Sequence, residues 1–131
     1  MLLVKTKVKS SKIHGLGIFA EQAIKQGTPI WAFEPRLDRI LNLADLAALP
    51  RQTVEFLEHY CEYFPETGEL VLSGDNDRYT NHADDPNTVV VGRNSPHASV
   101  IAARDIKKGE EITCDYTVIR SRKWGLARAY A

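Results

Sequence analysis

The chain has 131 residues, a length typical of one globular domain built around a single hydrophobic core. Seventeen Lys and Arg residues balance seventeen Asp and Glu residues, so no net charge attracts nucleic acid or an anionic membrane surface. The apolar share of 44% is that of a soluble protein, and no apolar run is long enough for a membrane span or a signal peptide. We therefore expect a single cytoplasmic domain over residues 1–131, with no direct nucleic-acid or membrane binding.

The cysteine content argues against a disulfide framework and against a zinc centre. Cys61 and Cys114 lie far apart in the sequence, and neither belongs to a Cys-x-x-Cys pair. Such pairs are the usual units of structural zinc sites and of redox centres. The pattern favours a reducing compartment and predicts no metal site.

Two strands are predicted in the first third of the chain. The run VKTKVK at residues 4–9 alternates Val or Thr with Lys, which is the period of a strand with one solvated face. A glycine-interrupted loop follows in SKIHGLGIFA. A second strand is expected over residues 30–33, because Pro29 and Pro35 frame this stretch and discourage a helix.

The middle of the chain predicts a helical insertion over about residues 36–72. The segments LNLADLAALP and RQTVEFLEHYCEYF are rich in helix formers, and Asn42 is suited to cap a helix. At helical spacing Val54, Leu57 and Cys61 share one face, which we expect in the core together with most aromatic side chains of this segment.

Strand patterns return after the insertion in ELVLSG, TVVVG, ASVIAA and EEITCDYTV, separated by turn-forming segments such as RDIKKGE. Gly109 in that turn suits a left-handed conformation. A C-terminal tail covers about residues 119–131. Many short strands around one helical insertion predict a mainly β fold of the α+β type.

The segment NHADDPN, residues 81–87, concentrates polar chemistry in one loop. His82, Asp84 and Asp85 offer metal ligands, but neighbouring residues in one loop rarely complete a metal site by themselves. The acidic run at residues 75–77 begins like a calcium loop and lacks its glycine and closing glutamate. A metal centre is therefore not expected here.

Nucleophilic and phosphate-binding sites also lack their usual motifs. The chain contains no Gly-x-Ser-x-Gly elbow, and HGLG at residues 14–17 lacks the third glycine and the Lys-Ser/Thr pair of phosphate loops. The two glycines of HGLG favour either a simple bend or a close approach of the backbone to a ligand.

Three segments occur in an order that resembles one family. SKIHGLGIFAEQAIKQGTPI comes first, DRYTNHADDPNTVV follows the insertion, and ARDIKKGEEITCDY comes last. They resemble the three motifs of SET-domain protein-lysine methyltransferases: a Gly-x-Gly loop, an Arg-Phe-x-Asn-His-Ser-x-x-Pro-Asn loop, and Gly-Glu-Glu-Leu/Ile-Thr-x-Asp-Tyr. The resemblance covers about residues 4–118. It implies short β-sheets, a helical insertion and a knot-like C-terminal segment.

The chain departs from the family motifs at three positions. Tyr79 stands where phenylalanine is usual, and Ala83 replaces the usual serine. Asp84 stands where many eukaryotic members have a cysteine that joins a C-terminal zinc cluster. With no cysteine after Cys114, the chain resembles a minimal, zinc-free form.

The resemblance implies a binding site for the methyl donor S-adenosyl-L-methionine. Arg78 either braces the donor's carboxylate or forms a structural ion pair, and Trp124 either stacks on the adenine or belongs to an amphipathic tail. The residues implied in donor binding are His14, Gly15, Leu16, Gly17, Arg78, Asn81, His82, Tyr116 and Trp124.

Tyr116 is the implied catalytic residue, because its phenol would orient the target amine and the transferring methyl group. Asp115 is expected to be structural. Four residues are expected to line the channel for the substrate lysine: Tyr60, Tyr63, Val90 and Cys114. Cys114 is small and carries no hydroxyl, so we expect space for more than one methyl group unless Tyr60 or Tyr63 fills it.

Three functions are compatible with these patterns. The first is an S-adenosyl-L-methionine-dependent protein-lysine N-methyltransferase acting on a protein or peptide lysine. The second is a non-catalytic SET-fold module that binds a peptide or partner, which Ala83 and the small size leave open. The third, an unrelated β-rich adaptor, would require three ordered motifs to match by coincidence. A homodimer that completes the peptide groove is a further expectation.

Overall fold

The computed structural model describes residues 1–64, 67–92 and 98–117. The strands are β1 (Thr6–Ser10), β2 (Leu16–Ala20), β3 (Pro29–Trp31), β4 (Arg39–Asn42), β5 (Glu62–Phe64), β6 (Glu69–Leu72), β7 (Asn81–His82), β8 (Thr88–Val91), β9 (Ser99–Ala102) and β10 (Glu111–Cys114). The helices are the 3-10 helix η1 (Leu43–Ala48), the α-helix α1 (Arg51–Tyr60) and the 3-10 helix η2 (Asn76–Tyr79). The mainly β fold with a helix-containing insertion is confirmed.

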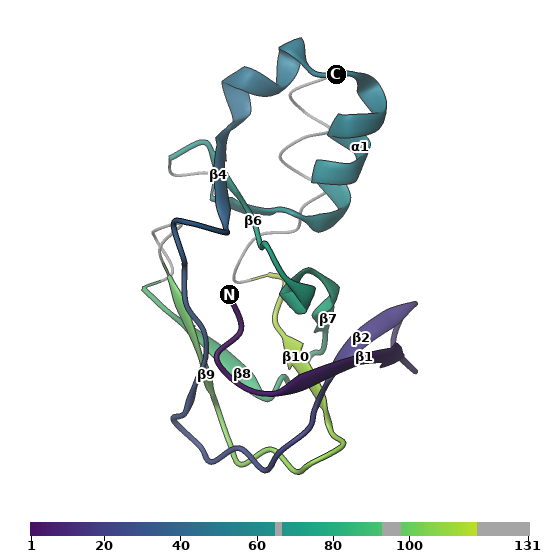
Figure 1. Cartoon of the computed structure of the whole chain (residues 1–131), viewed down its shortest axis with the longest axis vertical. Coiled ribbons are helices and arrows are strands. Elements are labelled where there is room, and N and C mark those ends of the chain that lie inside the picture. The colour runs from purple at the N-terminus through teal and green to yellow at the C-terminus, as the bar shows by residue number, and fades with distance from the viewer. Residues whose placement is uncertain (65–66, 93–97, 118–131) are drawn as a thin grey trace.

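The first sheet has the order β1-β2-β10-β7 and brings the three sequence motifs together (Figure 1). β10 pairs antiparallel with β2 and parallel with β7, where Thr113 lies opposite Asn81 and Cys114 opposite His82. A parallel pair requires a long crossover. Here the crossover contains β8 and β9, so the last motif returns to lie between the first two.

The second sheet, β3-β9-β8, packs with the first around the main core. The strands predicted near Ile30, in TVVVG and in ASVIAA are confirmed as β3, β8 and β9. Apolar side chains from both sheets and their connecting turns are almost fully buried in this core: Ile18, Ala20, Ile24, Ile30, Ala102, Ile106 and Ile112. This core therefore fixes the positions of the strands, and the loops that form the candidate site extend from these strands.

The predicted N-terminal strand begins later than its sequence pattern suggests. β1 starts at Thr6, whereas the alternation starts at Val4. The preceding residues pair elsewhere: Leu2 forms an isolated bridge with Trp31, and the Leu3 amide donates to the Ile30 carbonyl at 2.7 Å. Pairing with β3 thus removes these residues from the first sheet.

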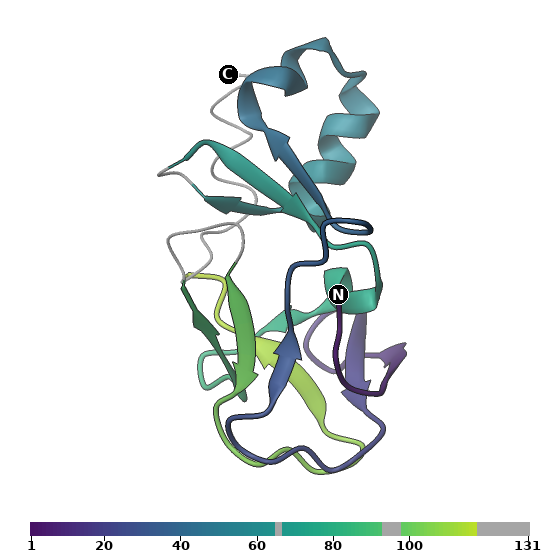
Figure 2. The same ribbon diagram turned by 60° about the vertical axis from the view of Figure 1, so that its left-hand side comes forward.

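The insertion forms its own sheet, β4-β6-β5, covered by η1 and α1 (upper part of Figure 2). Asn42 caps η1, with its side chain accepting from the Ala44 amide at 3.1 Å. Val54, Leu57 and Cys61 are buried, as the helical spacing predicted. The insertion is therefore a small sheet-and-helix unit with its own core, less helical than its composition indicated.

Two expectations for the insertion are wrong. The helix ends at Tyr60, and Glu62–Phe64 forms β5, because Phe64 gains more by packing with Trp31 and Val71 against the rest of the domain. Phe56, expected in the core, is 40% exposed. Its ring packs beside that of Tyr60 on the same face of α1, with the two ring centroids 5.0 Å apart.

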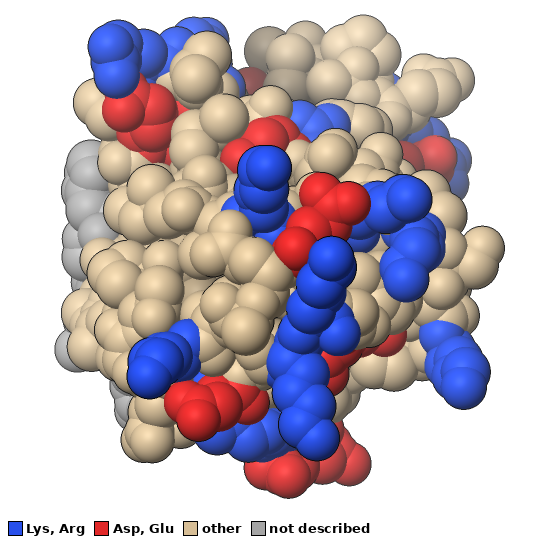
Figure 3. Space-filling view, turned by 60° about the horizontal axis from the view of Figure 1, so that its bottom comes forward, with Lys and Arg blue, Asp and Glu red and all other residues tan. Residues whose placement is uncertain are grey.

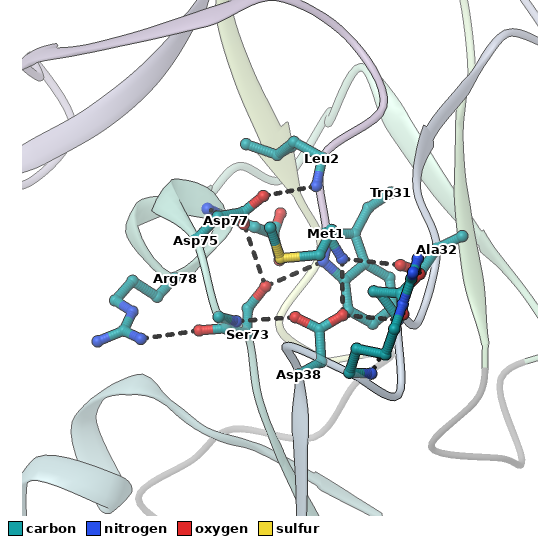
Figure 4. Close-up of polar contacts among 12 residues, drawn as sticks. Met1, Leu2, Trp31, Ala32, Asp38, Ser73, Asp75, Asp77 and Arg78 are labelled. Atoms are coloured by element: carbon teal, nitrogen blue, oxygen red, sulfur yellow. Dashed lines mark hydrogen bonds and ion pairs between the residues drawn. The ribbon is translucent and has the colours of Figure 1, made fainter.

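Asp38 joins the N-terminal segment to the base of the insertion (Figure 4). Its fully buried carboxylate accepts from the Met1 amine at 2.7 Å and from the amides of Glu34 and Gly74 at 2.8 Å each. Every oxygen of this buried charge therefore has a donor, as its burial requires.

Asp38→Ala is expected to lower the free energy of unfolding by about 3 kcal/mol, because it removes the charged partner of the half-buried Met1 ammonium and the acceptor of two amides. Urea unfolding measures the change. The matched control is Glu55→Ala, which removes an exposed ion pair with Arg51 at 3.0 Å and should change stability by less than about 0.5 kcal/mol. Equal losses in the two variants would contradict the assigned role of Asp38.

Figure 3 shows a face on which Lys and Arg side chains are interspersed with Asp and Glu, in agreement with the balanced composition. Charges of both signs in close succession largely cancel at a distance. Among the described residues, none of the helices is long and apolar enough to span a membrane.

Candidate functional site

A cavity of about 560 Å³ opens between the glycine loop, η2 with β7, and the C-terminal end of α1. Its size falls within the usual range for pockets that bind small molecules, about 300–1,000 Å³. Seven of the residues implied in donor binding by the sequence line it: His14, Gly15, Leu16, Arg78, Asn81, His82 and Tyr116. The fold therefore collects residues from all three motifs around one space.

The Asn81 side chain fixes the glycine loop against the end of β7. It is 6% exposed, and its amide nitrogen lies 3.0 Å from each of three acceptors: the carbonyl oxygens of His14 and Leu16 and a carboxylate oxygen of Glu111. Side-chain bonds of this kind leave the loop little freedom to move. Asn81 thus shapes the cavity wall that residues 14–16 form.

Gly17 is required by a close approach and not by an unusual backbone angle. A β-carbon at this position would collide with the Glu111 carboxylate and come within 3.2 Å of the Asn81 amide. Gly15, by contrast, has a φ of +45° with open space around it. The first glycine therefore makes the bend, and the second allows β2 and β10 to enclose the Asn81–Glu111 pair.

Tyr116 is held by two bonds to the second motif. Its hydroxyl donates to the Thr80 carbonyl at 2.6 Å, and its backbone amide donates to Nδ1 of His82 at 3.0 Å. The pairing of β10 with β7 brings these groups together, although they are more than thirty residues apart in sequence. The ring of Tyr116 is therefore fixed in direction at the edge of the cavity.

The same contacts set the tautomer of the neutral His82 ring. Because Nδ1 accepts from Tyr116, the proton of the neutral ring lies on Nε2, which faces the Asp84 carboxylate at 3.0 Å. Asp115 turns the chain after β10 by accepting from the Thr117 hydroxyl and amide, and the hydroxyl bond chiefly lowers the pKa of this carboxyl. Asp115 thus has a structural role, as predicted, and β10 ends at Cys114.

Arg78 connects the second motif with the insertion. Its guanidinium donates to the Ser73 carbonyl at 2.9 Å and lies 5.7 Å and 5.8 Å from the ring centres of Phe56 and Tyr60. Contacts of a guanidinium with aromatic faces are favourable at such distances. Arg78 also lines the cavity, so these structural contacts place a positive charge on its wall.

Two much smaller cavities, of about 10 and 30 Å³, lie near the large one, and Tyr116 lines the smaller of the two. The smaller of them shares four lining residues with the large cavity: Tyr60, Arg78, Thr80 and Tyr116. Cys114 lines both small cavities, and Val90 lines one of them. A wide space and a narrow one therefore meet at the Tyr116 ring.

Three residues predicted for the site lie apart from these cavities or beyond the described residues. Tyr63 packs against the core of the insertion, pairing with Leu70 across β5 and β6. Gly17 lies beneath the glycine loop and not on its surface. Trp124 lies outside the described residues.

Sequence reasoning missed several lining residues. Thr80 is the second residue of the YTNH segment, and only its contact with the Tyr116 hydroxyl shows that it belongs to the site. Glu58 and His59 come from α1, and Trp31 from β3. Their positions depend on how the insertion packs, for which the sequence carries no local signal. Among the described residues, no group of three or more His, Cys, Asp or Glu is arranged to hold a metal ion.

The described geometry agrees with comparisons to known proteins. The SET domain family profile matches residues 15–117. A histone-lysine N-methyltransferase of Saccharomyces cerevisiae, described as specific for H3 lysine-36, is 30% identical over 116 residues. The corresponding protein of Candida albicans is also 30% identical. These matches cover 84% and 88% of this chain but only 16% and 14% of the relatives' own length.

Solved structures show the same fold. Polycomb Repressive Complex 2 of Chaetomium thermophilum, bound to GSK126, superposes with a TM-score of 0.72 at 20% identity, over 97% of this chain and 17% of that chain. A structure described as "ctPRC2 in an autoinhibited conformation bound to S-adenosylmethionine" superposes with a TM-score of 0.69 at 19% identity, over 97% of this chain and 16% of that chain. With the family match extending over most of its length, the chain belongs to the SET-domain family.

Proposed function

We propose that the protein is an S-adenosyl-L-methionine-dependent protein-lysine N-methyltransferase. One observation carries the proposal: a ligand-sized cavity and a narrow one meet at a tyrosine whose direction is fixed by two hydrogen bonds. Methyl transfer needs a donor and an amine that approach one another from opposite sides in line. The arrangement around Tyr116 offers a separate space for each.

The large cavity suits the methyl donor. Backbone groups of the glycine loop, the Arg78 guanidinium and the His82 ring surround a volume of about 560 Å³, which provides polar partners and aromatic surface together. His14, Gly15, Leu16, Asn81 and Tyr116 would hold the donor with them. When bound, S-adenosyl-L-methionine supplies a methyl group activated by its sulfonium centre.

Tyr116 would act where the two cavities meet. It lines both the large cavity and the smaller narrow one, and its hydroxyl is fixed 2.6 Å from the Thr80 carbonyl. A polar group held in place before the reaction stabilises developing charge without reorganisation. Tyr116 would thus orient the incoming lysine amine and stabilise the transferring methyl group. Cys114, Val90 and Tyr60 would line the path of the lysine.

The replacement of serine by Ala83 does not disturb the loop. The Ala83 backbone amide donates to the Cys114 carbonyl at 3.0 Å and so continues the pairing of β7 with β10. Because this bond uses the main chain, no side-chain hydroxyl is needed to seat the loop. A catalytic function is therefore favoured over that of a non-catalytic binding module.

The proposed acceptor is a lysine of a protein, in keeping with the relatives from Saccharomyces cerevisiae and Candida albicans, which are named as methyltransferases specific for lysine-36 of histone H3. Purified protein should be incubated with a cell lysate and S-adenosyl-L-methionine labelled in its methyl group. Label incorporated into protein, followed by mass spectrometry of the labelled bands, would identify substrate and lysine. A folded protein that transfers no label to protein would contradict the proposal.

Cys114→Tyr is expected to shift products from di- or trimethyl-lysine towards monomethyl-lysine. Cys114 is buried and lines both narrow cavities, so a ring there would fill the space and its hydroxyl could tether the amine. Mass spectrometry of a substrate at long incubation times measures the ratio. Cys114→Ser is the control, because it adds no bulk and should keep multiple methylation. Only monomethyl-lysine from the unmodified protein would refute the expectation.

A further inference from the structure

The carboxylate of Asp77 lies beside the narrow cavities, on the opposite side of Thr80 from the Tyr116 hydroxyl. The Thr80 hydroxyl is 3.1 Å from Oδ1 of Asp77, and the Thr80 carbonyl accepts from Tyr116 at 2.6 Å. Five residues line both narrow cavities: Trp31, Glu62, Asp77, Thr80 and Cys114. A single residue therefore separates this acidic group from the implied catalytic phenol.

We propose that Asp77 is a substrate-positioning residue, whose carboxylate receives the ammonium group of the substrate lysine in the narrow cavities beside Tyr116. This inference rests on the proposed lysine methyltransferase function. It specifies how the lysine is captured as its ammonium ion; the amine must then release this proton before it attacks the methyl group, because an ammonium has no lone pair. The buried Trp31 ring at the same cavities offers an aromatic surface that also suits a cation.

The charges around Asp77 favour a cation at this place. Asp75 and Asp77 lie close together beside the Met1 amine (Figure 4), and desolvation followed by the charge of Asp75 raises the pKa of Asp77 to about 6. This net value of the pKa includes decreases from the Thr80 hydroxyl and the Met1 amine and a smaller increase from Asp38.

Two further charged residues line the smaller of the narrow cavities together with Asp77. They are Glu62 and Arg78. The Arg78 guanidinium points to the Ser73 carbonyl and the aromatic rings of α1. Among the described residues, no Lys or Arg forms an ion pair with Asp77. At neutral pH the Asp77 carboxylate is thus ionised in surroundings that disfavour its negative charge. An arriving ammonium group would stabilise that charge.

Asp75 is the acidic residue that stabilises this turn. Its carboxylate accepts from the amides of Leu2 at 2.7 Å and Asp77 at 3.1 Å, which caps η2. The Asp77 carboxylate is not needed for the cap. The two neighbouring carboxylates therefore offer a matched pair of variants, one with a structural role and one with the proposed substrate role.

The test compares Asp77→Asn with Asp75→Asn, using as acceptor the lysate proteins that test the proposed function, or the substrate identified from them. Asp77→Asn should raise KM for the acceptor about tenfold or more, because a hydrogen bond to a charged group is lost, while kcat changes by less than about threefold. Its melting temperature at pH 7.5 should equal or exceed that of the unmodified protein. Asp75→Asn should lower the melting temperature and leave KM within about threefold.

The pH dependence gives a readout that a structural role would not move. Because the pKa of Asp77 is raised from 3.8 to about 6 in the folded state, the unmodified protein should lose stability relative to Asp77→Asn as pH rises from about 4 through 6, and the difference should be constant at higher pH. By the same ionisation, the ratio of kcat/KM between the unmodified protein and Asp77→Asn should fall from about ten at pH 8 towards one below pH 6.

Three outcomes decide the proposal. A raised KM in Asp77→Asn with an unchanged or higher melting temperature and a ratio that falls with pH supports it. An unchanged KM, or a loss of activity that merely follows a lower melting temperature, overturns it while leaving the methyltransferase function standing. Absence of transfer by the unmodified protein overturns both, and is recognised before any variant is compared.

Discussion

Tyr116→Phe is expected to reduce the rate of methyl transfer by about 100-fold or more, while the fold and the affinity for the methyl donor are retained. The substitution removes only the hydroxyl that donates to the Thr80 carbonyl at 2.6 Å. The backbone bond from Tyr116 to His82 remains, so the ring should keep its place in the lining of both cavities. Single-turnover kinetics with labelled donor measures the rate, and thermal unfolding verifies the fold.

Tyr79→Phe is the matched control for this prediction. Tyr79 is also half-buried, lines the large cavity and lies with its ring centre 5.9 Å from that of Tyr60. Related sequences usually carry phenylalanine at this place in the motif, so loss of its hydroxyl should change the rate by less than about threefold. A Tyr116→Phe variant as active as Tyr79→Phe would remove Tyr116 from the catalytic role.

Asn81→Ala is expected to abolish most of the stabilisation that the methyl donor gives. A ligand present at 100 times its Kd, bound only to the folded state, stabilises a protein by about 2.7 kcal/mol. Without the Asn81 amide, the carbonyl oxygens of His14 and Leu16 lose their shared donor, and the glycine loop loses its position. Melting curves with S-adenosyl-L-methionine or its demethylated product measure the effect.

Asn87→Ala provides the comparison, because Asn87 is a second buried asparagine bonded to the same strand. Its amide donates to the Glu111 carbonyl at 2.8 Å, and its oxygen accepts from the Thr113 amide at 2.9 Å. Both variants should lower the melting temperature of the free protein, since each leaves buried groups unpaired. Only Asn81→Ala should lose the shift caused by the donor. Equal loss in both variants would mean that β10, and not the glycine loop, governs binding.

The sequence predicted well what depends on local pattern. Alternation and proline positions located β3, β8 and β9, and helical spacing identified the buried face of α1 through Val54 and Leu57. These predictions succeed because one buried face repeats at the period of the element. The order of three motifs indicated the family, and the fold then explains their order: β10 lies between β2 and β7.

Other features could not be read from local pattern because they depend on distant partners. Phe64 leaves the helical pattern to pack with Trp31, which lies thirty-three positions earlier in the sequence, and Leu2 pairs with the same residue. Thr80 gains its contact with the Tyr116 hydroxyl only because β10 pairs with β7. The placement of Tyr63 in the core of the insertion likewise follows from the register of β5 with β6. Cellular location and homodimer formation stay predictions.

The central claim, that this site transfers a methyl group to lysine, is tested most directly with a donor whose methyl group carries deuterium. The purified protein is incubated with this donor and acceptor proteins, beside a parallel reaction with Tyr116→Phe, and the peptides are examined by mass spectrometry. We expect deuterated methyl groups on lysine side chains with the unmodified protein and almost none with the variant. A folded protein that binds the donor yet places no deuterated methyl group on any lysine would contradict it.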